Sequence, residues 1–241
     1  MTQHIRKPFL IVLIILLILA LTAGVLFLLF PHILDYHRLR GTDIDERMKE
    51  YPAITETVPA DFAARTSHGI TVKAPEEYLN PKASNIAPFK SDDLTILVFS
   101  ADDGVSYPDE AGRFTAEEYQ HFFDTIGTEM PGTLIENIIF LRDTLTAATC
   151  LRLRGTDYEI FEEQAEYKES VIKIETPYYY HGANFDGLIC ELPNSKKKVT
   201  NVLVSDNAHQ NYATVTINCN DKTLTHQIIA GLDVTAFQAG N

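Results

Sequence analysis

An unbroken apolar segment constrains this chain more than any other feature. It runs for 23 residues, from Pro8 to Phe30, and contains no ionisable side chain. As a helix with a rise of about 1.5 Å per residue it would be about 34 Å long, enough to cross a hydrocarbon core of about 30 Å. The sequence therefore predicts a membrane-spanning helix at residues 8–30, with the lipid bilayer as its partner.

A cleaved signal peptide is the alternative interpretation of this segment. The apolar part of a signal peptide is about 7 to 15 residues long and ends at small residues, whereas the small residues here lie mid-segment, between Ala20 and Gly24. We therefore favour an uncleaved anchor. Ala20 and Gly24 form a small-xxx-small pair that allows a weak homodimer through the span, although single pairs of this kind are common in membrane helices.

The basic residues around the span bear on its orientation. Arg6 and Lys7 border it directly, whereas the first Lys or Arg after it is Arg38. A simple count of nearby basic residues favours the opposite orientation, but long domains cross the membrane largely regardless of charge. We expect a short cytoplasmic head at residues 1–7 and an extracytoplasmic domain, at the cell membrane.

The chain is acidic, with a formal net charge of −13 at pH 7. Nucleic-acid phosphates and anionic lipid surfaces attract Lys and Arg and repel such a charge. The composition therefore argues against a nucleic-acid partner and against adsorption to anionic lipid.

The segment after the span divides into a charged connector at residues 31–65, with a short helix at about 44–50, and a domain at 66–241. Period-two runs of apolar and β-branched residues predict strands in the domain at 69–74, 94–100, 171–175, 187–192, 199–205 and 212–219. Three T-x-x-E capping boxes predict helix starts at Thr115, Thr133 and Thr156, and a further short helix is expected near 224–232. This order predicts an α+β domain with a mainly antiparallel sheet and helices on one face.

Three cysteines are present, Cys150, Cys190 and Cys219. If the last three predicted strands pair in sequence as a meander, Cys190 and Cys219 lie two strand spacings of about 4.8 Å apart, beyond the reach of a disulfide. We expect free, buried thiols.

Motif searches return no hydrolase, zinc-protease or nucleotide-binding signature, so we predict no catalytic residue, no metal and no cofactor. Asp102, Asp103 and Gly104 resemble a calcium loop only superficially, because the alternating ligands and final Glu of an EF-hand are missing. A solvated acidic turn is the simpler interpretation.

Two long irregular segments, 75–93 and 101–114, flank the strand at 94–100. Loops of this length inside compact domains are uncommon and often bind partners. We therefore expect a binding surface there, with these contacts: Tyr78, Phe89, Asp102, Asp103 and Tyr107.

A second candidate site is the tract Tyr178 to His181. Three consecutive Tyr rings cannot all face one side of a strand, so Tyr179 and His181 are candidate contacts for a sugar or an aromatic side chain. The alternative is a tyrosine-rich edge strand without a ligand.

These observations favour a single-pass membrane-anchored protein with a non-catalytic binding domain at the cell envelope, whose partner is an envelope protein or a small ligand. An envelope hydrolase is the alternative and requires a carboxylate beside His121, His181 or Cys150 in a concave pocket. A third hypothesis, a subunit or immunity-type interaction protein, requires a flat exposed apolar patch.

Overall fold

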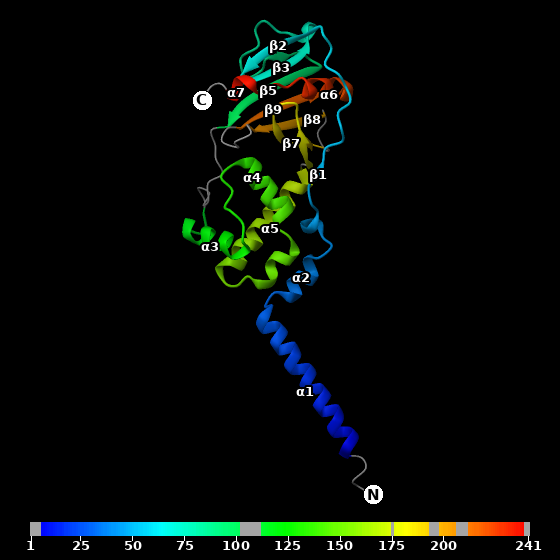
Figure 1. Ribbon diagram of the computed structural model, residues 1–241, viewed down its shortest axis with the longest axis vertical. Helices are drawn as coiled ribbons and strands as arrows, with labels where there is room; N and C mark the ends of the chain where they lie inside the picture. The colour runs from blue at the N-terminus through cyan, green and yellow to red at the C-terminus, as the bar shows by residue number, and fades with distance from the viewer. Residues whose placement is uncertain (1–5, 102–111, 175, 193–197, 206–211, 239–241) are drawn as a thin grey trace.

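The computed structural model describes residues 6–101, 112–174, 176–192, 198–205 and 212–238. The molecule is elongated, with a single long helix at one end, a helical layer next to it and a β-sheet at the far end (Figure 1).

Helix α1, Arg6–Leu29, forms the stalk of the molecule. Its Ile11–Leu29 part is long and apolar enough to cross a membrane, and none of it is buried inside the protein. Large apolar side chains such as Leu17 and Leu28 therefore have no protein core to enter. A short helix, α2 (Ile33–Leu39), follows.

The domain is built on a seven-stranded sheet with the order β1-β6-β7-β8-β9-β5-β4. The strands are β1 Lys49–Glu50, β4 Phe89–Lys90, β5 Leu94–Ala101, β6 Thr176–His181, β7 Asp186–Leu192, β8 Val199–Ser205 and β9 Tyr212–Cys219. All neighbours are antiparallel except β1 and β6, which are parallel. A separate hairpin pairs β2 (Phe62–Ser67) with β3 (Ile70–Pro75). The α+β class, the mainly antiparallel sheet and the β7-β8-β9 meander are confirmed.

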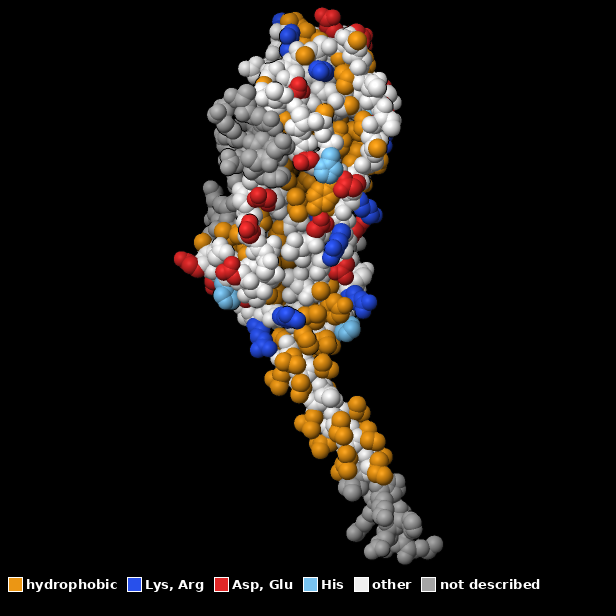
Figure 2. Space-filling model, in the orientation of Figure 1, with side chains coloured by type: hydrophobic (Ala, Val, Ile, Leu, Met, Phe, Trp, Pro, Cys, Tyr) orange, Lys and Arg blue, Asp and Glu red, His pale blue; other side chains and the backbone are white. Residues whose placement is uncertain are grey.

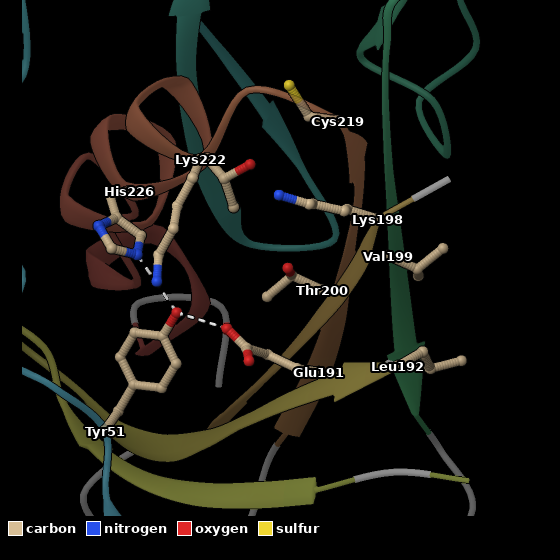
Figure 3. A pocket seen from close by; sticks show the side chains of 10 residues that line it. Tyr51, Glu191, Leu192, Lys198, Val199, Thr200, Cys219, Lys222 and His226 are labelled. Carbon is tan, nitrogen blue, oxygen red and sulfur yellow. Dashed lines mark hydrogen bonds between the residues drawn. The ribbon is translucent and has the colours of Figure 1, made fainter. Parts of the chain in front are cut away.

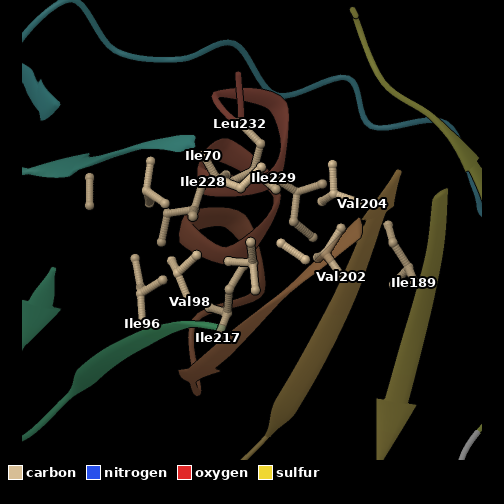
Figure 4. Packing of buried hydrophobic residues seen from close by; sticks show 14 of the residues in the cluster. Ile70, Ile96, Val98, Ile189, Val202, Val204, Ile217, Ile228, Ile229 and Leu232 are labelled. Carbon is tan, nitrogen blue, oxygen red and sulfur yellow. The ribbon is translucent and has the colours of Figure 1, made fainter. Parts of the chain in front are cut away.

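Side chains alternate between the two faces of this sheet, as expected for strands. On one face, Val202, Val204 and Ile217 pack with Ile228 of helix α6 (Lys222–Ala230) and with Ile70 of the hairpin (Figure 4). On the other face, a smaller cluster joins β7 and β8 to helix α4 (Leu134–Ile139) and comprises Met48, Ile135, Leu188, Cys190 and Leu203. Helices thus contact both faces of the sheet, whereas we expected them on one.

The helical layer between α1 and the sheet has its own core. It contains α3 (Ala116–Ile126), α4, a π-helical turn η3 (Phe140–Thr144), a 3-10 segment η4 (Ala147–Arg152) and α5 (Thr156–Ile174). The buried apolar side chains of this core are mostly aromatic or leucine, and they include Phe122, Phe123, Phe140, Leu145 and Phe161.

Two of the three predicted capping boxes are present. Thr115 with Glu118 starts α3, and Thr133 with Glu136 starts α4. The third is wrong in detail, because Thr156 is the first residue of α5 itself and Glu159 bonds Arg113, with 2.6 Å between Oε2 and Nη2.

Two predicted elements are wrong. Residues 171–175 were expected as a strand, but α5 continues to Ile174 and the strand starts at Thr176. The helix expected at 44–50 is replaced by a 3-10 turn, η1 (Asp43–Asp45), and by β1. Through Ile44 and Tyr51 this segment enters two hydrophobic cores, so residues 31–65 pack against the domain along much of their length.

The three cysteines are free and buried, as predicted. Cys190 lies in the cluster next to α4, whereas Cys219 belongs to the core beneath α6. The two thiols therefore lie on opposite faces of the sheet, which separates them further than the strand spacing alone.

Candidate functional site

A cavity of about 240 Å³ opens where the ends of β7, β8 and β9 meet the start of α6 (Figure 3). Its lining mixes charged, hydroxyl and apolar side chains, and consists of Tyr51, Glu191, Leu192, Lys198, Val199, Thr200, Cys219, Lys222, Thr225 and His226. Four distant parts of the chain therefore converge here: the segment after β1, the end of β7, the β8-β9 pair and α6.

Tyr51 and His226 connect the cavity to two carboxylates. The Tyr51 hydroxyl donates to Glu191 Oε1 at 2.9 Å and lies 3.2 Å from His226 Nε2. On the other side of the imidazole, Nδ1 is 3.1 Å from Glu56 Oε1, a charge contact that lacks hydrogen-bond geometry. These contacts form a continuous polar chain of carboxylate, imidazole, phenol and carboxylate.

Local structure fixes each member of this chain. Tyr51 follows β1 and its backbone N–H donates to the carbonyl of Tyr179 at 2.7 Å, which holds the ring against the sheet. His226 lies on α6, whose first turn is capped by Asp221 through the N–H of Leu224. The imidazole is 8% exposed, so its orientation is set by protein contacts.

The electrostatics favour a phenol that stays protonated. Burial, together with the hydrogen bond and negative charge of Glu191, raises the pKa of Tyr51 well above its usual value of 10.0. At neutral pH Tyr51 is therefore a hydrogen-bond donor. The pKa of Glu56 is lowered, first by its own backbone N–H and also by His226, so this carboxylate is ionised.

Two lysines face this chain. The side chains of Lys198, at the start of β8, and Lys222, at the start of α6, both point into the cavity (Figure 3). Both side chains are exposed. Ammonium groups have three donors and no acceptor, so the open side of the cavity favours an anionic group.

The two residues predicted as contacts in the tyrosine tract each pair with a carboxylate. Tyr179 is partly buried, and its hydroxyl donates to Asp143 Oδ2 at 2.6 Å, which ties β6 to η3. His181 has a side chain that is 67% exposed, and it pairs with Asp186 at 2.7 Å. This hydrogen bond raises the pKa of His181. Neither residue lines the cavity.

Two of the five residues predicted for the loop surface are described by the structure, and both pack against the sheet core. Phe89 is fully buried in the sheet core, because β4 pairs with β5 there, and the expectation that it is an exposed contact is wrong. Tyr78 packs partly buried against the same core, at the end of a 3-10 turn, η2 (Glu76–Tyr78). Asp102, Asp103 and Tyr107 lie outside the described residues.

The hydrolase hypothesis required a carboxylate beside one of three named residues in a pocket. Asp157 lies 2.9 Å from His121, but the side chain of His121 is 73% exposed. Burial raises the pKa of Cys150 to about 11, and its thiol donates to the carbonyl of Ala147 at 3.0 Å. A thiol held protonated in this way is not an activated nucleophile.

The residues that form the cavity were not among those predicted as site residues. Tyr51, Glu191 and His226 lie far apart in the chain and match no motif. One weak signal existed: His226 and Thr225 interrupt the apolar stripe of the short helix, at positions that are buried.

Neither a metal-binding arrangement nor a similarity to known proteins assigns a role to this cavity. Among the residues that the structure describes, no group of three or more His, Cys, Asp or Glu side chains is placed to hold a metal ion. Comparison with protein-family models, curated proteins and solved structures gives no match.

Proposed function

We propose that this chain is a single-pass membrane-anchored protein whose acidic extracytoplasmic domain binds a small anionic ligand without catalysis. The proposal of an anchor is supported by the exposed apolar helix α1. The orientation is supported by Arg6 and Lys7, which border the span.

The observation that carries the binding function is the cavity lined by Tyr51, with the side chains of Lys198 and Lys222 pointing into it. A carboxylate or phosphate placed there would accept charge-assisted hydrogen bonds from both ammonium groups. Glu191 and Thr200, which belong to the same lining, would discriminate among ligands through their neutral or cationic part. The volume is below the range of about 300 to 1,000 Å³ typical of drug-sized ligands, so the ligand would be small.

The envelope hydrolase remains the second candidate, because Glu56, His226 and Tyr51 form a carboxylate, imidazole and hydroxyl chain like those that activate nucleophiles. The raised pKa of Tyr51 works against this function, since a phenolate is needed for attack. Binding without catalysis is therefore the stronger proposal.

Calorimetric titration of the full chain in detergent tests the binding function, with citrate as the carboxylate probe and inorganic phosphate as the phosphate probe. Replacing Lys198 and Lys222 by Gln should weaken binding of the responding probe by about 10-fold per lysine. The matched control is Lys90→Gln, an exposed lysine on β4 outside this cavity, which should bind normally. Equal binding by the double variant and the control would refute the assignment.

Hydrolysis of 4-nitrophenyl acetate and 4-nitrophenyl phosphate separates the two candidates. The binding proposal expects the wild-type rate to equal that of His226→Gln. A wild-type rate well above background that is lost in His226→Gln would favour the hydrolase.

A further inference from the structure

The base of the domain carries a group of exposed basic side chains around the end of α1. We call the side chains of His37, Arg38, Arg152 and Arg154 the basic collar. We propose that the basic collar binds the phosphate groups of anionic phospholipids in the membrane that α1 crosses. This inference rests on the proposed membrane anchoring and is independent of the cavity.

Contacts between α1 and the domain fix the height of the collar. Arg154 Nη2 donates to the carbonyl of Leu28, in the last turn of α1, at 2.6 Å. Just beyond α1, the imidazole of His32 stacks on the ring of Tyr158, with centroids 3.4 Å apart. The domain is therefore held directly against the end of the span, and its base lies at the level where lipid headgroups begin.

The collar comes from two segments that pack together at this height. His37 and Arg38 lie on α2, which packs against η4, and Arg152 and Arg154 lie at the end of η4 and just after it. Lys and Arg side chains accordingly gather where the apolar stalk enters the domain, and acidic side chains are more frequent above them (Figure 2).

The three arginines of the collar are exposed, and Arg38 also lines a pocket that contains three glutamates of α5. The side chain of Arg38 is 67% exposed, and its contact with Asp35 is a surface pair at 3.3 Å. Asp35 is the only carboxylate of α2, and residues 147–155 contain none. Arg152 and Arg154 are both exposed residues.

Local charge at the bilayer surface outweighs the net charge of the chain. Charges separated by more than about 8 to 10 Å are largely screened at physiological salt, so the acidic far end of the domain contributes little. Guanidinium groups bind phosphate oxygens bidentately, which favours Arg over Lys at such a surface. Leu34, 66% exposed on the same helix as Arg38, adds an apolar contact for the outer part of the bilayer.

The chain contains no Trp, so a single reporter can be placed beside the collar. Leu34→Trp in the full chain, reconstituted in nanodiscs of phosphatidylcholine with phosphatidylglycerol, places this reporter next to the headgroups. Quenching by brominated phosphatidylglycerol is compared with quenching by brominated phosphatidylcholine at matched mole fractions. Their ratio measures how far the anionic lipid is enriched at the collar.

We expect phosphatidylglycerol to be preferred by at least about 5-fold, because each basic residue near an anionic surface supplies about that factor. Arg38→Gln with Arg152→Gln should lower the ratio by at least about 5-fold, and Arg154 is retained because it holds Leu28. The matched control is Arg65→Gln with Lys73→Gln, on the β2-β3 hairpin at the far end of the molecule (Figure 1), which should keep the preference.

Two results would overturn the inference: equal quenching by both lipids in the reporter protein, or a preference that is unchanged by removal of Arg38 and Arg152. Absence of quenching by either lipid would instead show that position 34 is not at a membrane. That outcome contradicts the anchoring itself, so the two failures are distinguishable.

Discussion

The buried ammonium of Lys168 gives the sharpest test of how the helical layer is held together. This side chain is fully buried in α5, and its Nζ donates to three backbone carbonyls: Ile44 at 2.5 Å, Leu145 at 2.7 Å and Arg142 at 3.1 Å. It therefore joins α5, the connector and η3. Lys168→Met keeps the length and apolar stem of the side chain but removes all three hydrogen bonds.

The expected loss of stability in Lys168→Met at pH 7 follows from the three carbonyl groups that lose their donor. Leaving one buried acceptor without a donor costs about 1 to 3 kcal/mol. Relief of the desolvated charge offsets part of the total for three acceptors. We expect the free energy of unfolding to fall by about 2 to 4 kcal/mol.

The pH dependence of the stability provides an independent test of the same role. Burial, aided by the nearby charge of Arg142, lowers the pKa of Lys168 from 10.5 to about 8. Between these values the unfolded state binds a proton that the folded state does not, so the stability supplied by this residue rises with pH. From pH 7 to pH 9 the gain is about 1 kcal/mol.

Urea unfolding of the full chain in detergent, followed by near-ultraviolet circular dichroism, measures both effects. The contributions of all other titrating groups to the pH dependence cancel in this comparison, because the variant contains the same groups. The wild type should gain about 1 kcal/mol on Lys168→Met between pH 7 and pH 9. Parallel pH dependences, or a variant as stable as the wild type at pH 7, would refute the role assigned to Lys168.

Three further predictions concern the sheet. Gly187→Ala should lower the free energy of unfolding by more than about 2 kcal/mol, because a Cβ there would lie 2.0 Å from a carbonyl oxygen of β8. The control Gly132→Ala places its Cβ 3.6 Å from the nearest atom and should change stability little. Equal melting temperatures of the two variants would contradict this prediction. Phe89→Ala should cost about 3 to 5 kcal/mol in urea unfolding, and Ile86→Ala, at a side chain 45% exposed, much less. All three cysteines should be alkylated after non-reducing denaturation and resist alkylation before it; a disulfide-linked peptide in mass spectrometry would contradict the strand order.

Much of the sheet could be predicted because alternate side chains of its strands enter the same core. In β8 and β9 one side chain in two enters the core beneath α6, and that period is visible in the sequence. The starts of α3 and α4 could be predicted for a similar reason, since a capping box is a local interaction between residues three apart.

Elements decided by distant contacts could not be predicted. Residues 171–174 have a strand-like composition, but they continue a helix that Lys168 anchors in the helical layer. Phe89 was expected in a loop because residues 75–93 look irregular in sequence, and its burial depends on the pairing of the two-residue strand β4 with β5. Tertiary contacts override local propensity in both places.

The cavity could not be predicted from the sequence for a related reason. Tyr51 belongs to a segment expected to be a connector, and only its position after β1 brings its hydroxyl to Glu191 and His226. The predicted site residues followed loop length and aromatic composition, whereas the structure forms its cavity from strand ends and one helix face.

The central claim, an anchored domain outside the cytoplasm, is tested most directly by protease accessibility. Protease is added to intact spheroplasts, and antibodies to the domain and to a cytosolic marker are used on membranes washed with alkaline carbonate. We predict that the domain is digested, that the cytosolic marker survives, and that the untreated protein stays at full length in the washed membranes. A domain that is protected until the membrane is broken, or a soluble form that lacks residues 1–30, would contradict the account.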